Sequence, residues 1–229
     1  MINTPLKDLE KALFDHAADY PSRSDRSEEF PVVHGDDLYP VSVIEPDLAE
    51  GPWIAGGAPL RWYENRPVGS SDIDVFCRNS QQAKSVIKRI KDLTSYRAAK
   101  TNNAQTYKLY QEEEIYGKAT GHVTKEWAIQ IITCNYYESA QQVVDRFDIT
   151  VCQIATAGTE WVLGKNTAAD IRNRRLRFAD QILAPDAVKR LVKYWTYGYR
   201  PDPGMIATII NNPDAAWSFD LAEDYDQLF

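Results

Sequence analysis

Two short motifs constrain the fold of this chain more than any other feature of its sequence. The first is the turn Gly56-Gly57, which follows the apolar run Trp53-Ile54-Ala55. The second is Asp72-Ile73-Asp74, at the start of another apolar run. Because successive side chains of a strand point to opposite faces, the two aspartates share one face while Ile73 points to a core. Together the motifs predict a strand, a tight turn, a short helix and a second strand that carries a carboxylate pair.

The chemistry of these residue types suggests what the unit could do. Two neighbouring carboxylates repel each other unless a cation lies between them, and hard oxygen ligands suit Mg²⁺, or Mn²⁺ in its place. A Gly-Gly turn lets backbone N–H groups approach a phosphate, and the helix after it presents its positive end. Each motif alone is more often an ordinary turn or the solvated face of a strand. Their combination favours nucleotidyl transfer from a nucleoside triphosphate.

The same residues resemble the signature of the polymerase β-type nucleotidyltransferase superfamily. Within it, the closest likeness is to the head and neck of tRNA nucleotidyltransferases and bacterial poly(A) polymerases. The compact layout is similar to that of short phage-encoded nucleotidyltransferases. Four blocks carry the resemblance in matching order, between about residues 53 and 200: Gly56 to Asp74, Asp145 to Val151, Asp170 to Arg177, and Asp186 to Gly198.

The resemblance implies an α+β fold, with a mixed-sheet nucleotidyltransferase head, flanking helices and a small helical C-terminal extension. Residues 1–180 would form the catalytic head with an N-terminal helix, and residues 181–229 a neck-like extension. Asp72 and Asp74 would be the catalytic residues and the Mg²⁺ or Mn²⁺ ligands. The implied nucleotide contacts are Gly56, Gly57, Arg61, Arg66, Ser71, Arg190 and Lys193.

The chain departs from the family pattern at one position that matters for catalysis. Many members supply a third carboxylate from a neighbouring strand, and the counterpart here is Gln130, which carries no charge and cannot act as a base. Three functions therefore stay open. They are transfer to an RNA 3′ end, transfer to a protein or small molecule, and a noncatalytic nucleotide- or partner-binding role for the retained fold.

Charge and cysteine content limit the partners further. A net charge of −7 is unusual for a protein that grips long RNA. Basic residues nevertheless cluster between Arg172 and Arg200, which favours a triphosphate and substrate face there. The chain has no apolar run long enough to span a bilayer and no secretory leader, so we expect a cytoplasmic protein without membrane contact. We expect Cys77, Cys134 and Cys152 to be buried free thiols.

Periodicity predicts the elements around the motifs. Leu6, Leu9 and Leu13 mark an N-terminal helix, Ser80 and Ser139 are expected N-caps, and Trp53 is expected to pack in the core. Residues 111–124 are expected to form a loop or a ragged hairpin, after a turn at Asn102-Asn103. The expected strands are 53–55, 72–77, 95–99, 105–110, 127–133, 149–155 and 160–163. The other expected helices follow Gly57, begin at Ser80, run from Ser139 to about Phe147, run from Asp186 to near Gly198, and contain Met205 to Ile210.

Overall fold

The computed structural model describes residues 33, 35–69, 71–93, 96–100, 104–115, 118–179 and 187–212. The helices are α2 (Leu38–Ile44), α3 (Gly57–Tyr63), α4 (Ser80–Asp92), α5 (Ala140–Asp145), α6 (Thr167–Arg172), α7 (Ala187–Thr196) and α8 (Pro203–Asn211), with 3₁₀ turns η2 (Gly35–Asp37) and η3 (Thr150–Cys152). The strands are β1 (Trp53–Ala55), β2 (Ile73–Phe76), β3 (Tyr96–Lys100), β4 (Ala104–Ile115), β5 (Lys118–Ile132), β6 (Ile154–Thr156), β7 (Trp161–Leu163), β8 (Arg175–Leu176) and β9 (Arg200–Pro201).

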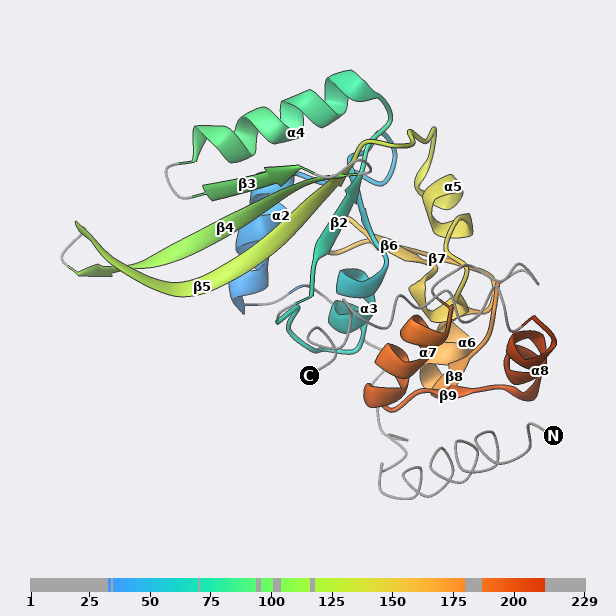
Figure 1. Ribbon diagram of the computed structural model, residues 1–229. Coiled ribbons are helices and arrows are strands. Elements are labelled where there is room, and N and C mark those ends of the chain that lie inside the picture. Colours follow the sequence, from blue (N-terminus) through green and yellow to red (C-terminus); the bar gives the residue numbers. More distant parts are fainter. Residues whose placement is uncertain are drawn as a thin grey trace.

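A seven-stranded mixed sheet organises the molecule, in the order β3-β4-β5-β2-β1-β6-β7. The β2–β5 pair is parallel, and the other strand pairs of this sheet are antiparallel. Strands β4 and β5 form a long hairpin that projects from the sheet (Figure 1). Its register is irregular between Gln111 and Glu114, so the ragged hairpin expected there is confirmed. The predicted α+β architecture with a mixed sheet is likewise confirmed.

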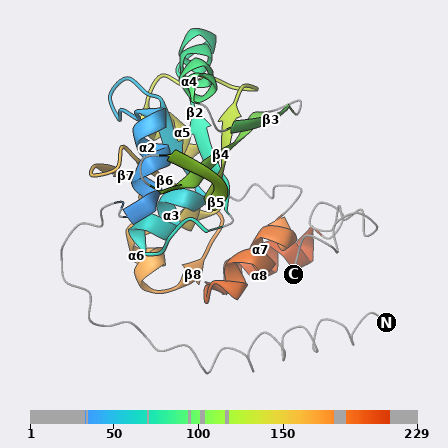
Figure 2. The same cartoon turned by 90° about the vertical axis from the view of Figure 1, so that its left-hand side faces the viewer.

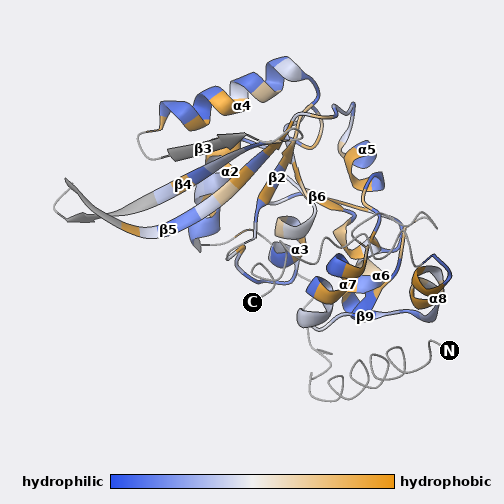
Figure 3. Ribbon diagram, in the orientation of Figure 1, coloured by the Kyte–Doolittle hydropathy of each residue, from blue (hydrophilic) through white to orange (hydrophobic). Residues whose placement is uncertain are grey.

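The faces of the central strands follow the predicted alternation. Ile54, Ile73 and Val75 are fully buried in a core that includes residues of α2 and α4. Trp53 is fully buried too, in a separate cluster with residues of α5. Helix α4 alternates polar and apolar residues along its length, as Figure 3 shows, because only one side of it packs on the sheet. The carboxylate of Asp74 therefore lies on the sheet face opposite the larger core.

A third cluster joins the sheet to the C-terminal helices. Leu60 of α3 packs there with Leu191 and Tyr194 of α7 and with Met205 of α8. Figures 1 and 2 place α7 and α8 at the end of the molecule away from α4. The position of α7 beside α3 is what brings residues of the expected neck-like segment to the carboxylate pair.

Three local predictions were wrong. Asn79, and not Ser80, caps α4, because its side chain accepts a hydrogen bond from the backbone N–H of Gln82 at 2.9 Å. The expected strand 149–155 begins with the turn η3, since the N–H of Cys152 bonds back to the carbonyl of Ile149. Cys134 is exposed, whereas Cys77 and Cys152 are buried as expected.

Other local predictions are confirmed or concern residues outside the described ranges. Ser139 caps α5 as expected, by accepting from the backbone N–H of Gln142. The expected N-terminal helix, the Asn102-Asn103 turn and Asp186 lie outside the described residues. The boundary between a head and an extension near residue 180 stays a prediction. Within the described ranges, no helix is long and apolar enough to cross a membrane.

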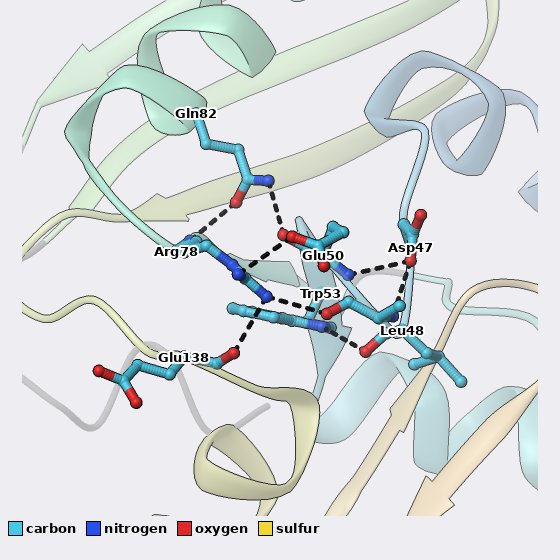
Figure 4. A network of polar contacts seen from close by, with 8 residues as sticks. Asp47, Leu48, Glu50, Trp53, Arg78, Gln82 and Glu138 are labelled. Atoms are coloured by element: carbon cyan, nitrogen blue, oxygen red, sulfur yellow. Dashed lines mark hydrogen bonds and ion pairs between the residues drawn. The ribbon is translucent and has the colours of Figure 1, made fainter.

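Arg78 ties the segment before β1 to the segment after β5 (Figure 4). Its Nη2 donates to the carbonyls of Ala49 at 2.9 Å and Glu138 at 3.1 Å, and its Nη1 pairs with Glu50 at 3.0 Å. The guanidinium also lies 6.0 Å from the centre of the Trp53 ring. These contacts fix the residues that lead into β1, the strand that precedes the glycine turn.

Candidate active site

Asp72 and Asp74 lie on the same face at the start of β2, as predicted. Asp72 is exposed and Asp74 is partly buried. Burial, and then the charge of Asp72, raises the pKa of Asp74 to about 7. Burial also raises the pKa of Asp72, although Lys193 and Lys108 oppose this rise. The two carboxylates are thus held together at an energetic cost that a bound cation would remove.

Gln130 occupies the strand position where a third carboxylate was expected. It lies opposite Asp74 in the parallel β2–β5 pair, and its Nε2 donates to Oδ2 of Asp72 at 2.7 Å. In the part of the chain that the structure describes, no group of three His, Cys, Asp or Glu residues could hold a metal ion. The donor set still fits Mg²⁺, because this ion often takes one or two protein carboxylates and completes its shell with phosphate oxygens and water.

The glycine turn brings backbone close to the carboxylates. Gly56 has φ of 91°, and a Cβ at this residue would lie 2.8 Å from the Phe147 ring and 3.8 Å from Oδ2 of Asp74. At Gly57 the nearest atom to such a Cβ would be the Tyr194 hydroxyl, at 3.9 Å. Gly56 is therefore required by both conformation and space, whereas Gly57 begins α3 with room beside it.

Helix α7 places Lys193 beside the carboxylate pair. Its ammonium lowers the pKa of both Asp72 and Asp74, against the larger effect of burial. The next residue, Tyr194, fixes the helix, because its buried hydroxyl accepts a hydrogen bond from the Cys152 thiol at 2.8 Å. The structure thus brings a residue 119 positions after Asp74 (193 − 74) to the same site.

Arg61, Arg66 and Ser71 meet at Tyr197, which follows the last turn of α7. The Arg61 guanidinium lies 4.7 Å from the Tyr197 ring centre and the Arg66 guanidinium 5.2 Å from it. Burial raises the pKa of Tyr197, but the nearby Arg61, Lys193 and Ser71 lower it more, so the net shift is downward.

Arg190 of the same helix is engaged with another carboxylate, that of Asp148. It forms a two-pronged ion pair with Asp148, with Nη1–Oδ1 at 3.0 Å and Nη2–Oδ2 at 2.9 Å. Its role as a nucleotide contact stays a prediction.

Much of the basic cluster between Arg172 and Arg200 is neutralised inside the fold. Fully buried Asp170 accepts from Arg175 at 2.8 Å and from Arg177 at 2.9 Å. Buried Glu64 pairs with Arg174 and also accepts from the Tyr199 hydroxyl at 2.9 Å. These arginines hold the fold together, so the charge cluster in the sequence overstates the positive surface available to RNA.

Sequence reasoning missed two parts of the site. Lys108 of β4 lies on the same sheet face as the carboxylates and pairs with Glu126 at 2.6 Å. Its residue type gave no signal, because only the β4–β5 register places it there. The convergence of Arg61 and Arg66 on Tyr197 was also missed.

Solved structures with the same fold include two complexes of CCA-adding enzymes. One contains CTP, is 14% identical, and has a TM-score of 0.58 over 80% of this chain and 44% of that chain. The other is the Thermotoga maritima enzyme with tRNA, at 14% identity and a TM-score of 0.54 over 79% of this chain and 43% of that one. The chain spans less than half the length of these proteins. A sequence comparison with curated proteins finds no match.

The fold and the placed carboxylate pair define a protein with the polymerase β-type nucleotidyltransferase fold, as the sequence resemblance implied. The model of the family described as Gabija anti-defense 2 family protein matches residues 37–174, more than half of the 229-residue chain. The chain belongs to the Gabija anti-defense 2 family.

Proposed function

We propose that the chain is a metal-dependent nucleotidyltransferase that moves a nucleoside monophosphate from a triphosphate to an acceptor hydroxyl. The observation that carries the proposal is the pair Asp72 and Asp74 on one strand face, beside the Gly56 turn and within reach of the charge of Lys193 of α7. The Gly56 N–H donates to the Ile154 carbonyl at 2.9 Å, so the N–H of Gly57 at the start of α3 is the one that binds phosphate, and Lys193 offsets the phosphate charge. Arg61 and Arg66 contact phosphate or ribose, with Ser71 beside them. Arg190 is a candidate contact to the base or triphosphate, as the family likeness implies.

Asp72 and Asp74 would hold the Mg²⁺ ions, or Mn²⁺ in their place. Such ions would neutralise charge on the phosphates and favour the deprotonated form of the attacking hydroxyl. The raised pKa of Asp74 supports this assignment, because a buried carboxyl next to Asp72 takes its charged form most readily with a cation present.

The family name supplies a purpose for the reaction. We infer that the transfer counteracts the Gabija defence and takes place in the cytoplasm, where the triphosphate is available. The fold of CCA-adding enzymes, one of which was solved with tRNA, supports an RNA 3′ end as acceptor. The internal pairing of Arg174, Arg175 and Arg177 argues for a smaller or protein acceptor, because it leaves fewer cations for an RNA backbone.

A noncatalytic role is the second candidate, and Gln130 favours it. An amide at this position leaves the site with two carboxylates and no third group to accept the proton of an attacking hydroxyl. In that case the chain would bind a nucleotide or a protein of the defence system without turnover.

Transfer of label separates these candidates. The protein is incubated with each α-³²P-labelled nucleoside triphosphate and Mg²⁺ or Mn²⁺, together with total RNA and lysate protein. We expect label on an acceptor with wild-type protein and none with Asp72→Asn or Asp74→Asn. Asp92→Asn is the matched control, since Asp92 pairs with Lys88 on the surface of α4. Transfer by the Asp72→Asn, Asp74→Asn double variant would refute the assignment. Nucleotide binding without any transfer would favour the noncatalytic role.

A further inference from the structure

Two arginines lie against the same aromatic ring, just after the end of α7. The Arg61 guanidinium lies 4.7 Å and the Arg66 guanidinium 5.2 Å from the centre of the Tyr197 ring. The turn after α3 brings these arginines together, because Asn65 has φ of 55° and the N–H of Arg66 bonds back to the carbonyl of Arg61 at 2.8 Å. Tyr197 thus holds two side chains of one turn through cation–π contacts.

The two guanidiniums are only partly neutralised. Among the described residues, no carboxylate forms an ion pair with Arg61, and Nη1 of this side chain donates to the Pro67 carbonyl at a long 3.5 Å. Arg66 reaches Glu64 at 3.4 Å, but this buried carboxylate also pairs with Arg174. Like charges held on one ring repel each other, so a bound anion would stabilise the arrangement.

A series of short contacts connects this ring to the carboxylate pair. A Cβ on Gly56 would lie 3.8 Å from Oδ2 of Asp74. A Cβ on the next residue, Gly57, would lie 3.9 Å from the Tyr194 hydroxyl, and the Tyr194 ring meets the Tyr197 ring edge to face, with centroids 5.9 Å apart. A phosphate chain that begins at the carboxylates and crosses the glycine turn would therefore approach the two arginines.

The Tyr197 ring is better placed to position the arginines than to stack on a base. Two guanidiniums already lie against it, so a base would have to displace at least one of them. A planar guanidinium carries a fork of N–H donors that matches the oxygens of a phosphate. The chemistry of this surface therefore suits the phosphate end of a nucleotide and not its nucleoside end.

We propose that Tyr197 is a positioning residue whose ring holds Arg61 and Arg66 as a clamp for the terminal phosphates of a nucleoside triphosphate. The inference deepens the proposed function and rests on the triphosphate site assigned there. Because the clamp contacts phosphate alone, it selects for the length of the phosphate chain and does not discriminate between bases. Inorganic tripolyphosphate should therefore compete with every nucleoside triphosphate, whereas a nucleoside monophosphate should bind without contacting the clamp.

The test is calorimetric titration of the purified full chain with inorganic tripolyphosphate and Mg²⁺, and then with a nucleoside triphosphate and its monophosphate. Tyr197→Leu removes the aromatic face, so we expect about 10-fold weaker binding of tripolyphosphate and of the triphosphate, with monophosphate binding unchanged. Tyr197→Phe keeps the ring and should bind all three as wild type does. Tyr136→Leu, at an exposed tyrosine, is the matched control.

A cycle of variants shows whether Tyr197 acts through the arginines. Arg61→Gln together with Arg66→Gln removes the groups that the ring holds, so adding Tyr197→Leu to this pair should weaken tripolyphosphate binding little further. A ring that contacts the phosphates itself, or that only supports the fold, would instead give losses that multiply. Losses that multiply in this way overturn the positioning role.

The outcomes separate this inference from the proposed function. Unchanged tripolyphosphate binding in Tyr197→Leu, or an equal loss for monophosphate and triphosphate, overturns the clamp and leaves the transferase assignment intact. Triphosphate binding that weakens in Tyr197→Leu, while wild type transfers label to no acceptor, supports the clamp and overturns the transferase assignment. If Tyr197→Leu folds poorly, wild-type protein still decides, because tripolyphosphate that fails to compete with the triphosphate overturns the clamp.

Discussion

The Gln130 side chain donates a 2.7 Å hydrogen bond to Oδ2 of Asp72 across the parallel β2–β5 pair. The amide thus occupies the strand position that a third carboxylate would take, and it stabilises the charged form of Asp72 without adding charge. The site carries two potential negative charges, which Lys193 and Lys108 oppose from α7 and β4.

Replacing Gln130 with Glu tests the role of the amide. The change adds a third carboxylate beside Asp72 and Asp74, so like-charge repulsion should lower the thermal stability of metal-free protein and strengthen Mg²⁺ binding. The measurement is the midpoint of Mg²⁺-dependent stabilisation in thermal unfolding. Gln105→Glu, on the neighbouring β4 strand, serves as the control for an added charge. An unchanged Mg²⁺ midpoint in Gln130→Glu contradicts a metal site at this position.

The raised pKa of Asp74 predicts a specific dependence of stability on pH. Between about pH 4 and pH 7 the unfolded chain has lost this proton while the folded chain keeps it, because the pKa rises from 3.8 to about 7 on folding. The free energy of unfolding of metal-free protein should therefore fall as pH rises through this window. Mg²⁺ favours the carboxylate and should stabilise most above pH 7. Comparing urea unfolding of wild type and Asp74→Asn checks this, since the variant should lack this part of the slope.

The two glycines of the turn should respond differently to alanine. Gly56→Ala combines a positive φ with a Cβ 2.8 Å from Phe147, so it should cost roughly 2–4 kcal/mol of stability. Gly57→Ala meets no atom closer than 3.9 Å and should fold normally. Chemical denaturation of both variants measures the difference. Equal stability of the two variants would contradict this prediction, because it would mean that the turn and the Phe147 ring move apart to admit the added Cβ.

Asp37 is expected to be a structural centre for the segments around the site. This buried carboxylate accepts from the indoles of Trp62 and Trp127, each at 3.0 Å, and from the N–H of Val68 at 2.8 Å. Asp37→Ala leaves these donors without a partner and should cost about 2–4 kcal/mol. Its neighbour Asp36 is half exposed and pairs with Lys125, so Asp36→Ala should change stability little. Thermal unfolding of the pair of variants makes the comparison.

Substitutions of Lys193 and Arg190, three residues apart on α7, should affect different properties, namely triphosphate binding and thermal stability. Lys193 faces the carboxylate pair, so Lys193→Gln should weaken triphosphate binding roughly 10–100-fold with little change in melting temperature. Arg190 pairs with partly buried Asp148, so Arg190→Gln should chiefly lower the melting temperature. Calorimetric titration with a nucleoside triphosphate and thermal unfolding provide the two readouts. Reversed effects would assign the direct nucleotide contact to Arg190.

The sequence alone predicted the parts of this protein that depend on neighbours along the chain. The alternation in Asp72-Ile73-Asp74, the Gly56-Gly57 turn and the helix that begins at Ser80 each follow from a local sequence pattern, and the structure has them as expected. The prediction from local sequence failed where the hydrogen bond of one side chain sets the end of an element, since Asn79 and not Ser80 caps α4.

Tertiary structure decided which distant residues meet. The β2–β5 register sets Gln130 against Asp74, the β4–β5 hairpin brings Lys108 to their face, and the packing of α7 on α3 delivers Lys193. It also decided that Asp170 and Glu64 neutralise arginines that seemed to form a binding surface in the sequence. The physical reason is that charge and hydrogen bonding act over a few ångströms in space, and only chain topology determines which residues lie within that range.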